Sequence, residues 1–296
     1  MTPTFSIVVP TYHRPAALLR CLASLAGLEY DAARYEVIVV NDGGCPLPAE
    51  LPRQLEGSAP VTWLQQPHAG AGSARNLGVA HAEGEVIAFV DDDCTAAPDW
   101  LDAMATIWNS DPEAIIGGRI VNALPDNVYA TASQMLIGFL YEYYHGENGE
   151  TRQPPFFTTN NMAVSRALFQ HLGGFHTRMR MGEDREFCVR GRDAGFCLRY
   201  AQDACVLHWH ALGFRSFWGQ HVRYGRGNRE YHRAQEWRGE RNYRVESMDF
   251  YRSMLRYPFQ FERGRRAVQL SALMVLAQIG NVSGFAAESV MPHAWV

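Results

Sequence analysis

Short apolar runs alternate with amphipathic segments along the first half of the chain. Five of these runs are predicted to be strands, at residues 5–9, 35–40, 61–65, 85–90 and 114–121. Leucines at helical spacing follow the first run, and another helix is expected from Pro98 to about Trp108. Strands that alternate with helices through right-handed crossovers predict a mainly parallel sheet, which is a Rossmann-like α/β arrangement.

The second half of the chain is predicted to become helical. Helices are expected at 128–144 and 183–194, and strands at 156–165, which carries a polar insert, and at 196–208. From Ala211 onward the pattern is helical and rich in Arg and Tyr. Two parts are therefore predicted, an α/β domain over residues 1–210 and a helical C-terminal extension over residues 211–296.

Charge is unevenly spread over the two parts. The 296-residue chain has a formal net charge of −4, yet residues 215–266 contain 13 Arg against 6 acidic residues. Such a segment suits anionic phosphates or a membrane surface, and solvated helix faces explain it equally well. A nucleic-acid partner is not expected, because the pI is near 6.3 and no recognition motif occurs.

Membrane spans and disulfides are not expected. The longest apolar segment, 267–279, is interrupted by polar residues and is shorter than the roughly 18 residues of a typical span. It is expected to be a core or interfacial helix, which leaves peripheral membrane contact open. The amino-terminal residues do not resemble a secretory signal, and the six cysteines lack C-x-x-C pairing. Reduced thiols in a cytoplasmic protein are expected.

Three consecutive carboxylates, Asp91, Asp92 and Asp93, follow the fourth apolar run. At the carboxyl end of a parallel strand they would lie where open α/β sheets bind ligands. Adjacent carboxylates repel one another unless a cation or hydrogen-bond donors neutralise them, and Mg²⁺ or Mn²⁺ prefers hard oxygen ligands. A metal site is therefore predicted, with an acidic turn that caps the next helix as the alternative.

Other polar residues are predicted to meet at the same edge of the sheet. Asp42 and two glycines end the second strand, where they suit either a ligand or an ordinary turn. Arg75 lies in a glycine-rich helix entry whose spacing fits neither a P-loop nor a dinucleotide motif. His208 ends the last strand, as a ligand or as a satisfied core histidine. Glu183 and Asp184 open a helix, where carboxylates often only complement the helix dipole.

In order and spacing these segments resemble the family 2 glycosyltransferases, which have the GT-A fold. The resemblance runs from Phe5 to about Gly227 and rests on residues 6–12, 41–44, 74–76, 91–93, 173–175 with 183–184, and 208. It implies a metal-dependent, inverting, hexosyltransferase-type enzyme that moves a sugar from a UDP, dTDP or GDP donor to an acceptor hydroxyl. The implied acceptor is a saccharide, a lipid-linked intermediate or a small molecule such as a secondary metabolite.

The resemblance also implies a role for each site residue. Asp184 would be the catalytic base, and Asp93 and His208 would hold Mg²⁺ or Mn²⁺ on the diphosphate. The nucleotide pocket would be formed by Pro10, Thr11, Asp42, Arg75, Asp91 and Asp92. The donor sugar or acceptor would meet Gly174 and Glu183. Asn160 and Asn161, in the polar insert of the 156–165 run, are also expected to meet the donor sugar or acceptor, and Gln220, Arg223 and Arg226 to hold the diphosphate or the acceptor.

Two departures from the family pattern bear on this interpretation. Asn41 precedes Asp42 where many relatives have two acids, which affects the contacts to base and ribose. Gln220-x-x-Arg223-Tyr224 is similar to the Q-x-x-R-W signature of processive synthases, but Tyr replaces Trp, and the membrane helices of those enzymes are not predicted. We therefore expect single addition. Charge on a helix surface explains Arg223 and Arg226 equally well.

Two other functions stay open at this point. The first is a nucleotide-sugar-binding protein without turnover. The second is a sugar nucleotidyltransferase, which normally has a glycine-rich, basic loop after the first strand, whereas this chain has Thr11 to Pro15 there. The sequence does not indicate the oligomeric state.

Overall fold

The computed structural model of the protein describes residues 4–44, 59–145, 156–179, 181–237, 239 and 246–291. These residues form two compact units. Unit 1 contains the sheet and the helices around it. Unit 2 contains the helix at residues 128–145, a short segment ending at Gly182, and the chain from His210 onward. The chain therefore enters unit 2 before residue 211, where the sequence analysis places the division.

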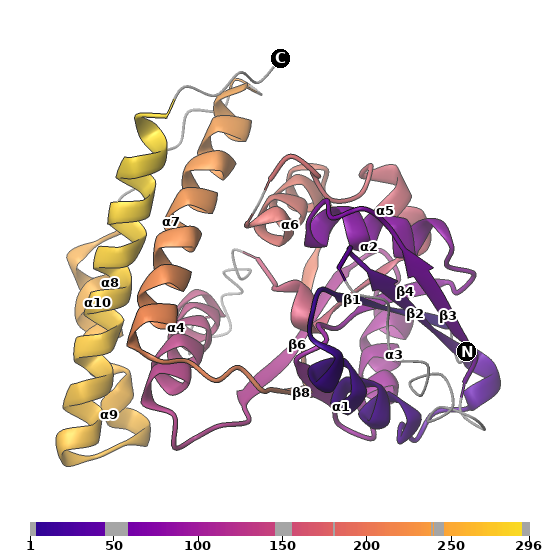
Figure 1. Ribbon diagram of the computed structural model, residues 1–296, viewed down its shortest axis with the longest axis horizontal. Helices are drawn as coiled ribbons and strands as arrows, with labels where there is room; N and C mark the ends of the chain where they lie inside the picture. The colour runs from indigo at the N-terminus through magenta and orange to yellow at the C-terminus, as the bar shows by residue number, and fades with distance from the viewer. Residues whose placement is uncertain are drawn as a thin grey trace. The chain divides into compact units, whose positions relative to one another are not determined.

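Unit 1 is organised around one eight-stranded sheet with the order β3-β2-β1-β4-β7-β6-β8-β5 (Figure 1). The strands are β1 (Phe5–Thr11), β2 (Tyr35–Asn41), β3 (Val61–Gln65), β4 (Val86–Phe89), β5 (Cys94–Ala96), β6 (Ile115–Asn122), β7 (Met162–Ser165) and β8 (Leu198–His208). β1 to β4 are parallel to one another, and β6 is parallel to β8. β7 is antiparallel to its neighbours β4 and β6, and β5 is antiparallel to β8. The predicted mainly parallel α/β fold is confirmed.

The helices of unit 1 follow the strands in the predicted alternation. They are α1 (Pro15–Ala26), α2 (Ala71–Ala80), α3 (Trp100–Ser110), α5 (Arg166–His171) and α6 (Glu183–Asp193), with 3-10 turns η1 (Ala32–Arg34) and η3 (Thr159–Asn161). Pro15 stands at the first position of α1, where its fixed φ suits a helix and its missing N–H costs no hydrogen bond. The buried face of α1 carries Leu18, Cys21, Leu22 and Leu25 at helical spacing.

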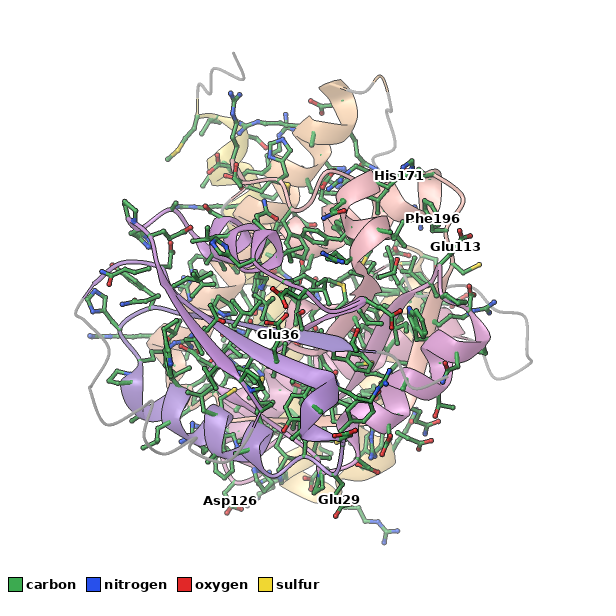
Figure 2. All side chains as sticks on the ribbon, turned by 90° about the vertical axis from the view of Figure 1, so that its right-hand side faces the viewer. Glu29, Glu36, Glu113, Asp126, His171 and Phe196 are labelled. Carbon is green, nitrogen blue, oxygen red and sulfur yellow. The ribbon has the colours of Figure 1, made fainter. Side chains whose placement is uncertain are left out.

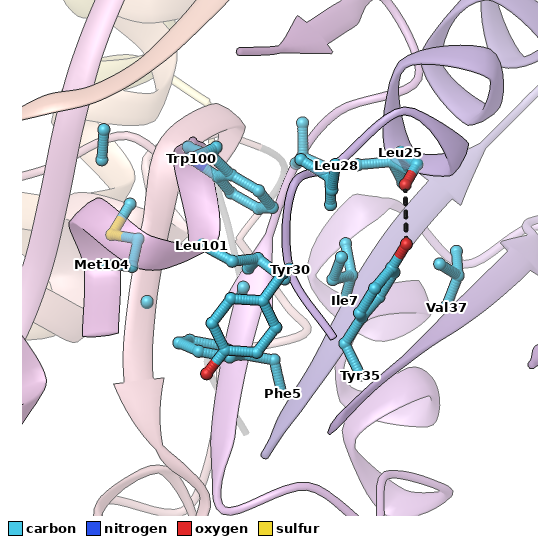
Figure 3. Packing of buried hydrophobic residues seen from close by; sticks show 14 of the residues in the cluster. Phe5, Ile7, Leu25, Leu28, Tyr30, Tyr35, Val37, Trp100, Leu101 and Met104 are labelled. Carbon is cyan, nitrogen blue, oxygen red and sulfur yellow. Dashed lines mark hydrogen bonds between the residues drawn. The ribbon is translucent and has the colours of Figure 1, made fainter. Parts of the chain in front are cut away.

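The main core lies between β1, β2, α1 and α3 (Figure 3). Phe5 from β1 and Trp100 from α3 are almost completely buried, and burial of each large apolar side chain contributes roughly 1.5–3 kcal/mol. Two polar groups of this core have internal partners. Tyr35 donates its hydroxyl to the Leu25 carbonyl at 3.0 Å, and the Trp100 indole donates to Asn161 at 2.8 Å.

The amino-terminal edge of the sheet is closed by local contacts. Ser6 donates to Glu36 at 2.6 Å and accepts from the Gly84 amide at 2.8 Å; Figure 2 labels Glu36 on its strand. A Cβ on Gly84 would lie 2.6 Å from the backbone of Phe5, so this turn requires glycine. On the same edge the His171 and Phe196 rings meet edge to face at 5.9 Å (Figure 2). The residues at the amino-terminal edge therefore have structural roles, and the candidate site residues lie at the opposite, carboxyl edge.

One expectation about unit 1 is wrong. The segment at 156–165 is not one strand, because Thr159–Asn161 form a 3-10 turn and only the last four residues pair in the sheet as β7. The polar insert interrupts the strand because the Asn161 side chain bonds to backbone groups. In addition, β5 and α5 were not predicted, since elements of three and six residues are too short to show a period.

Unit 2 consists of α4 (Val128–His145), α7 (Phe214–Trp237), α8 (Met248–Arg256), α9 (Pro258–Phe261) and α10 (Gly264–Ser289). The long helices α7 and α10 lie side by side (Figure 1). A Cβ on Gly225 would lie 1.9 Å from the Asn281 carbonyl oxygen, and one on Gly284 would lie 2.0 Å from that of Val222. The two backbones therefore touch, and this contact requires glycine at both positions.

Helix α10 is longer than the sequence analysis predicts. The pattern ended at residue 279, but Gly280 and Gly284 continue the helix because both are buried against α7. Among the described residues, α10 is the one helix long and apolar enough to cross a membrane by length and composition alone, and 33% of its most apolar window is buried in the protein.

Candidate functional site

The carboxyl edge of the sheet brings the predicted site residues together. β1 ends at Thr11, and Pro10 is buried within that strand. β2 leads into Asp42 and β4 into the three aspartates. β6 and β8 run in the same direction as β4, so His208 at the end of β8 belongs to the same edge.

Asp92 is the buried anchor of the aspartate loop. It is fully buried, accepts the Thr11 hydroxyl at 2.7 Å, and its other oxygen lies 2.7 Å from Arg14. Burial raises the pKa of Asp92 to about 7, although the positive charge of Arg14 opposes the shift. These contacts favour an anchoring role over the predicted nucleotide contact. Arg14 is half exposed and also binds Asp93 at 2.6 Å.

Arg75 joins the aspartate loop to the first turn of α6. Its guanidinium is almost completely buried and contacts Asp91 at 2.7 Å and Glu183 at 2.8 Å. The helix begins at Ala71, so Arg75 lies in the second turn of α2. Both Arg75 and Glu183 are occupied by protein partners, which favours positioning roles for them.

Asp184 follows Glu183 in the same turn of α6 and is only partly exposed. Burial raises the pKa of Asp184 to about 7, and the neighbouring charge of Glu183 adds to the shift. The Arg185 amide, which donates to Asp184 at 2.7 Å, and the charge of Arg75 act in the opposite direction. A carboxylate with a pKa near neutrality is well suited to accept a proton at physiological pH.

Asp42 organises the loop between β3 and α2. One oxygen accepts from the Gln66 amide at 2.6 Å and from the Ala69 N–H at 2.9 Å. The other accepts from the Gly70 N–H at 2.9 Å and lies 2.9 Å from the His68 ring. Both carboxylate oxygens of Asp42 thus bind the loop, and the residue is almost completely buried. These contacts favour a structural role for Asp42 in the loop.

An aromatic pair beside Asp42 is not predicted from the sequence. The Tyr12 ring stacks on His68 with centroids 4.3 Å apart and planes 22° from parallel, and both side chains are exposed. Gly43 and Gly44 have positive φ, and a Cβ on either would collide with His68 or His13. The glycine pair is therefore required by packing against the two histidines. The only sequence signal for the aromatic pair was Tyr12 next to a strand end.

Three possible metal-ligating side chains cluster where β5 meets β8. Asp93, Cys94 and His208 have ligand atoms within 4.8 Å of one another. Cys94 is the cross-strand partner of His208, and the Trp209 N–H donates to the Asp93 carbonyl at 2.8 Å. The unpredicted strand β5 is what brings Asp93 and His208 together, with Asp93 Oδ1 3.5 Å from His208 Nε2.

The donor set of this cluster fits Mn²⁺. Cys94 is fully buried, and burial raises its thiol pKa well above the ordinary value, which disfavours the thiolate form that a metal would bind. A carboxylate and an imidazole then remain, a pair that suits Mn²⁺ better than the oxygen-loving Mg²⁺. With Asp93 and His208 as its protein ligands, a bound cation would have positions open for oxygens of a substrate.

Two predicted sugar-contacting residues have structural partners. Asn161 is almost completely buried, and its amide bonds to Trp100 and to the carbonyls of Arg119 and Ala204, all within 2.9 Å. Gly174 has a φ of +73°, and a Cβ there would lie 2.9 Å from the Asn76 side chain. Asn160 is partly exposed and accepts from Thr158 at 2.6 Å.

Side chains from two helices hold the segment around Gly174. The Asn76 side chain donates to the Phe175 carbonyl at 2.8 Å and accepts from its N–H at 2.9 Å, as a neighbouring strand would. Arg190 donates to the carbonyls of Leu172 and Gly174. The turn is therefore held from both α2 and α6.

Arg223 and Arg226 lie on α7 in unit 2. Both are exposed, and neither forms an ion pair with another described residue. Gln220, one turn earlier, is buried and bonds to Ser133 at 2.8 Å and His210 at 2.9 Å. The resemblance to a processive signature is thus carried by a structural glutamine, Gln220, and an exposed arginine, Arg223. The diphosphate role of Arg223 and Arg226 stays a prediction.

Comparison with protein families and curated proteins gives a consistent result. The sequence model described as "Glycosyl transferase family 2" matches residues 6–173. The chain is 25% identical to "Glycosyltransferase AglE" of Haloferax volcanii, over 76% of this chain and 73% of that protein. It is 29% identical to "Pre-mycofactocin glycosyltransferase" of Mycobacterium tuberculosis over 74% of this chain, and spans only 46% of that protein.

Solved structures show the same fold at low sequence identity. The mannosyltransferase PcManGT from Pyrobaculum calidifontis, in complex with GDP-Man and Mn²⁺, superposes with a TM-score of 0.61 at 16% identity, covering 95% of this chain and 88% of that one. Residues 1–349 of S. aureus TarS, in complex with UDP-GlcNAc, superpose with a TM-score of 0.57 at 15% identity, covering 97% of this chain and 90% of that one.

Proposed function

This chain belongs to glycosyl transferase family 2, and we propose that it moves a sugar from a nucleotide-diphosphate donor to an acceptor hydroxyl with inversion, in a single addition. The proposal rests on one observation above the others. Asp184, whose pKa is about 7, is tied through Glu183, Arg75 and Asp91 to the loop that carries Asp93. The ion pairs of Arg75 thereby connect a proton acceptor to a candidate cation site.

In the proposed reaction the Asp184 carboxylate takes the proton of the acceptor hydroxyl as its oxygen attacks the anomeric carbon. The bond from that carbon to the diphosphate oxygen breaks, and the diphosphate leaves with its electron pair. Asp93 and His208 would hold Mn²⁺, which when bound supplies positive charge to the leaving group. Arg14, half exposed beside Asp93, is placed to add a second positive charge there.

The nucleotide is proposed to lie along β1 and β2. Tyr12 and His68 offer a flat exposed surface for a base, next to the loop that Asp42 holds. Thr11 and Asp91, at the strand ends, are proposed to face the ribose and diphosphate. The nucleotide is left open among GDP, UDP and dTDP, since the similar structures hold GDP-Man and UDP-GlcNAc.

For the acceptor, we propose a lipid-linked saccharide or a small molecule with a free hydroxyl. The relatives point to both classes, since one is named "Glucosyl-dolichyl phosphate glucuronosyltransferase", from Haloferax volcanii, and another "Pre-mycofactocin glycosyltransferase". A cytoplasmic location is proposed because the five described cysteines are all free.

The test uses Asp184→Asn, which keeps the shape of the side chain and removes its basicity. We expect turnover to fall by roughly 10²- to 10⁴-fold, the usual contribution of a general base, with donor affinity in the presence of Mn²⁺ unchanged. Asp193→Asn, in the exposed last turn of the same helix, is the matched control and should keep full activity.

Either alternative function predicts a different result. A protein that only binds the donor would show no turnover in the wild type with any acceptor, while it kept its affinity for donor. A nucleotidyltransferase would release pyrophosphate from a nucleoside triphosphate and a sugar phosphate. Activity of Asp184→Asn equal to that of the wild type would show that another group is the base.

A further inference from the structure

Helix α10 carries a second apolar stripe that faces away from the protein. Val268, Ala272, Val275, Ile279, Val282 and Ala286 are all exposed and follow one another at alternating spacings of four and three residues. Val268 is 58% exposed and Val282 68%. The opposite face, with Ala267, Leu270, Met274, Ala277, Gly280 and Gly284, is the one buried in unit 2.

Beyond Arg265 and Arg266 at its start, this exposed stripe has no charged neighbour on its own helix until Glu288. Between Arg266 and Glu288 the sequence contains no Asp, Glu, Lys or Arg. At 1.5 Å per residue this stretch is about 30 Å long. A helix face of that length in water normally carries charged side chains, so an uncharged and exposed one indicates an apolar partner.

The amino-terminal end of the stripe adjoins a corner of aromatic and basic residues. Phe259 and Phe261 on α9 are 52% and 58% exposed. Arg256, Arg263 and Arg265 flank them; all three are exposed, and none forms an ion pair with a described residue. The one acidic residue between Arg256 and Arg266, Glu262, is paired with Arg266 at 2.9 Å. We call α9 with these three arginines the Phe-Arg corner.

We propose that the Phe-Arg corner and the exposed stripe of α10 dock unit 2 on an anionic lipid surface. Exposed Phe side chains enter the boundary between headgroups and acyl chains, and arginines beside them contact lipid phosphates. The uncharged stripe continues this surface along the helix, while the buried face of α10 holds it to α7 and α4.

A second copy of the chain fits this surface less well. In an antiparallel pair of α10 helices, the arginines of one copy would meet the carboxyl end of the other. The described acid there, Glu288, is buried and already paired with Arg233 at 3.2 Å. In a parallel pair the arginines would face one another. Neither arrangement provides the negative charge that an anionic membrane supplies.

The proposal goes beyond the proposed function and does not depend on it. None of its residues belongs to the aspartate loop, the Asp42 loop or α6. Loss of lipid binding and loss of sugar transfer are therefore separable results.

The experiment measures co-sedimentation of the full chain with vesicles of phosphatidylcholine alone or mixed with phosphatidylglycerol. We expect binding that requires phosphatidylglycerol and weakens as salt is raised. The triple variant Arg256→Gln/Arg263→Gln/Arg265→Gln should lose roughly 100-fold in affinity, about fivefold for each arginine. Phe259→Ser/Phe261→Ser should bind equally poorly. Arg199→Gln, an exposed arginine of unit 1, is the control and should bind as the wild type does.

Each variant must keep the wild-type circular dichroism spectrum and the wild-type affinity for the donor, so that a loss of vesicle binding is not caused by misfolding. The proposal is overturned if the folded wild type ignores anionic vesicles. It is also overturned if the wild type is a dimer by light scattering, Val275→Asp/Val282→Asp converts it to a monomer, and vesicle binding is absent, since a second copy would then cover the stripe.

Discussion

Replacing Arg75 by Met removes a buried cation and leaves two carboxylates, Asp91 and Glu183, without their shared partner. The methionine keeps most of the apolar stem, so the change is mainly electrostatic. Removal of one member of a buried ion pair typically costs about 3–5 kcal/mol. Asp91 is 28% exposed and is partly solvated by water, so we expect the lower end, about 3 kcal/mol. That is a large part of the roughly 5–15 kcal/mol that stabilises a typical protein.

Urea unfolding, followed by fluorescence of the tryptophans, measures this loss as a lower midpoint at an unchanged slope. The matched control is Arg199→Met, which breaks an exposed pair with Asp111 at 2.9 Å and should cost no more than about 1 kcal/mol. Adding Glu183→Gln to Arg75→Met removes one of the stranded charges and should restore part of the stability. This non-additivity is the signature of a shared cation.

The same variant has a second readout in catalysis. The positive charge of Arg75 lowers the pKa of Asp184, so Arg75→Met should raise that pKa and move the acidic limb of the pH–rate profile upward. A stability loss of less than about 1 kcal/mol, or additive effects of Arg75→Met and Glu183→Gln, would refute the reasoning that Arg75 is the electrostatic link between the loop and α6.

Three further predictions follow from single contacts. Since only the carboxylate form of Asp184 accepts a proton, kcat/KM should rise with pH to a plateau above about 7, and a flat profile from pH 5 to 8 would exclude this base. Gly284→Ala should lower stability by at least about 1–3 kcal/mol in thermal unfolding, because the new methyl would meet the Val222 carbonyl at 2.0 Å. Cys94→Ala should leave Mn²⁺ affinity by calorimetry unchanged while Asp93→Asn reduces it; the reverse order would make the thiol a ligand.

The sequence was sufficient to predict the part of the fold in which a strand and a helix repeat several times. Five apolar runs and the helices between them gave the parallel core because each run was bounded by turns and repeated the same unit. It did not predict the antiparallel direction of β7, because side-chain alternation does not encode strand direction. It missed β5 because three residues show no period, and with it the reason that Cys94 faces His208.

For the site, the residue types were predictable and their partners were not. Asp184 and Arg75 could be named from their motifs, but the bond from Arg75 to Glu183 joins residues 108 positions apart and depends on tertiary structure. Arg14 and His68 belong to no motif, and only the fold places them beside Asp93 and Asp42. Asn161 was assigned to the sugar because a polar residue in an apolar run reads equally well as a ligand contact or a buried hydrogen-bond centre.

Helix α2 has a consequence for how this enzyme could change its substrate. Its entry binds Asp42 through the Gly70 amide, Arg75 reaches both Asp91 and Glu183, and Asn76 holds Phe175. The Asp42 loop, Asp91, Glu183 and Phe175 are therefore all bonded to α2 or its entry, and a shift of α2 would move all of them. A change of donor preference through α2 is therefore expected to disturb Asp184, the proposed base. Variation in the nucleotide should instead be accommodated by side chains that α2 does not hold, such as Tyr12.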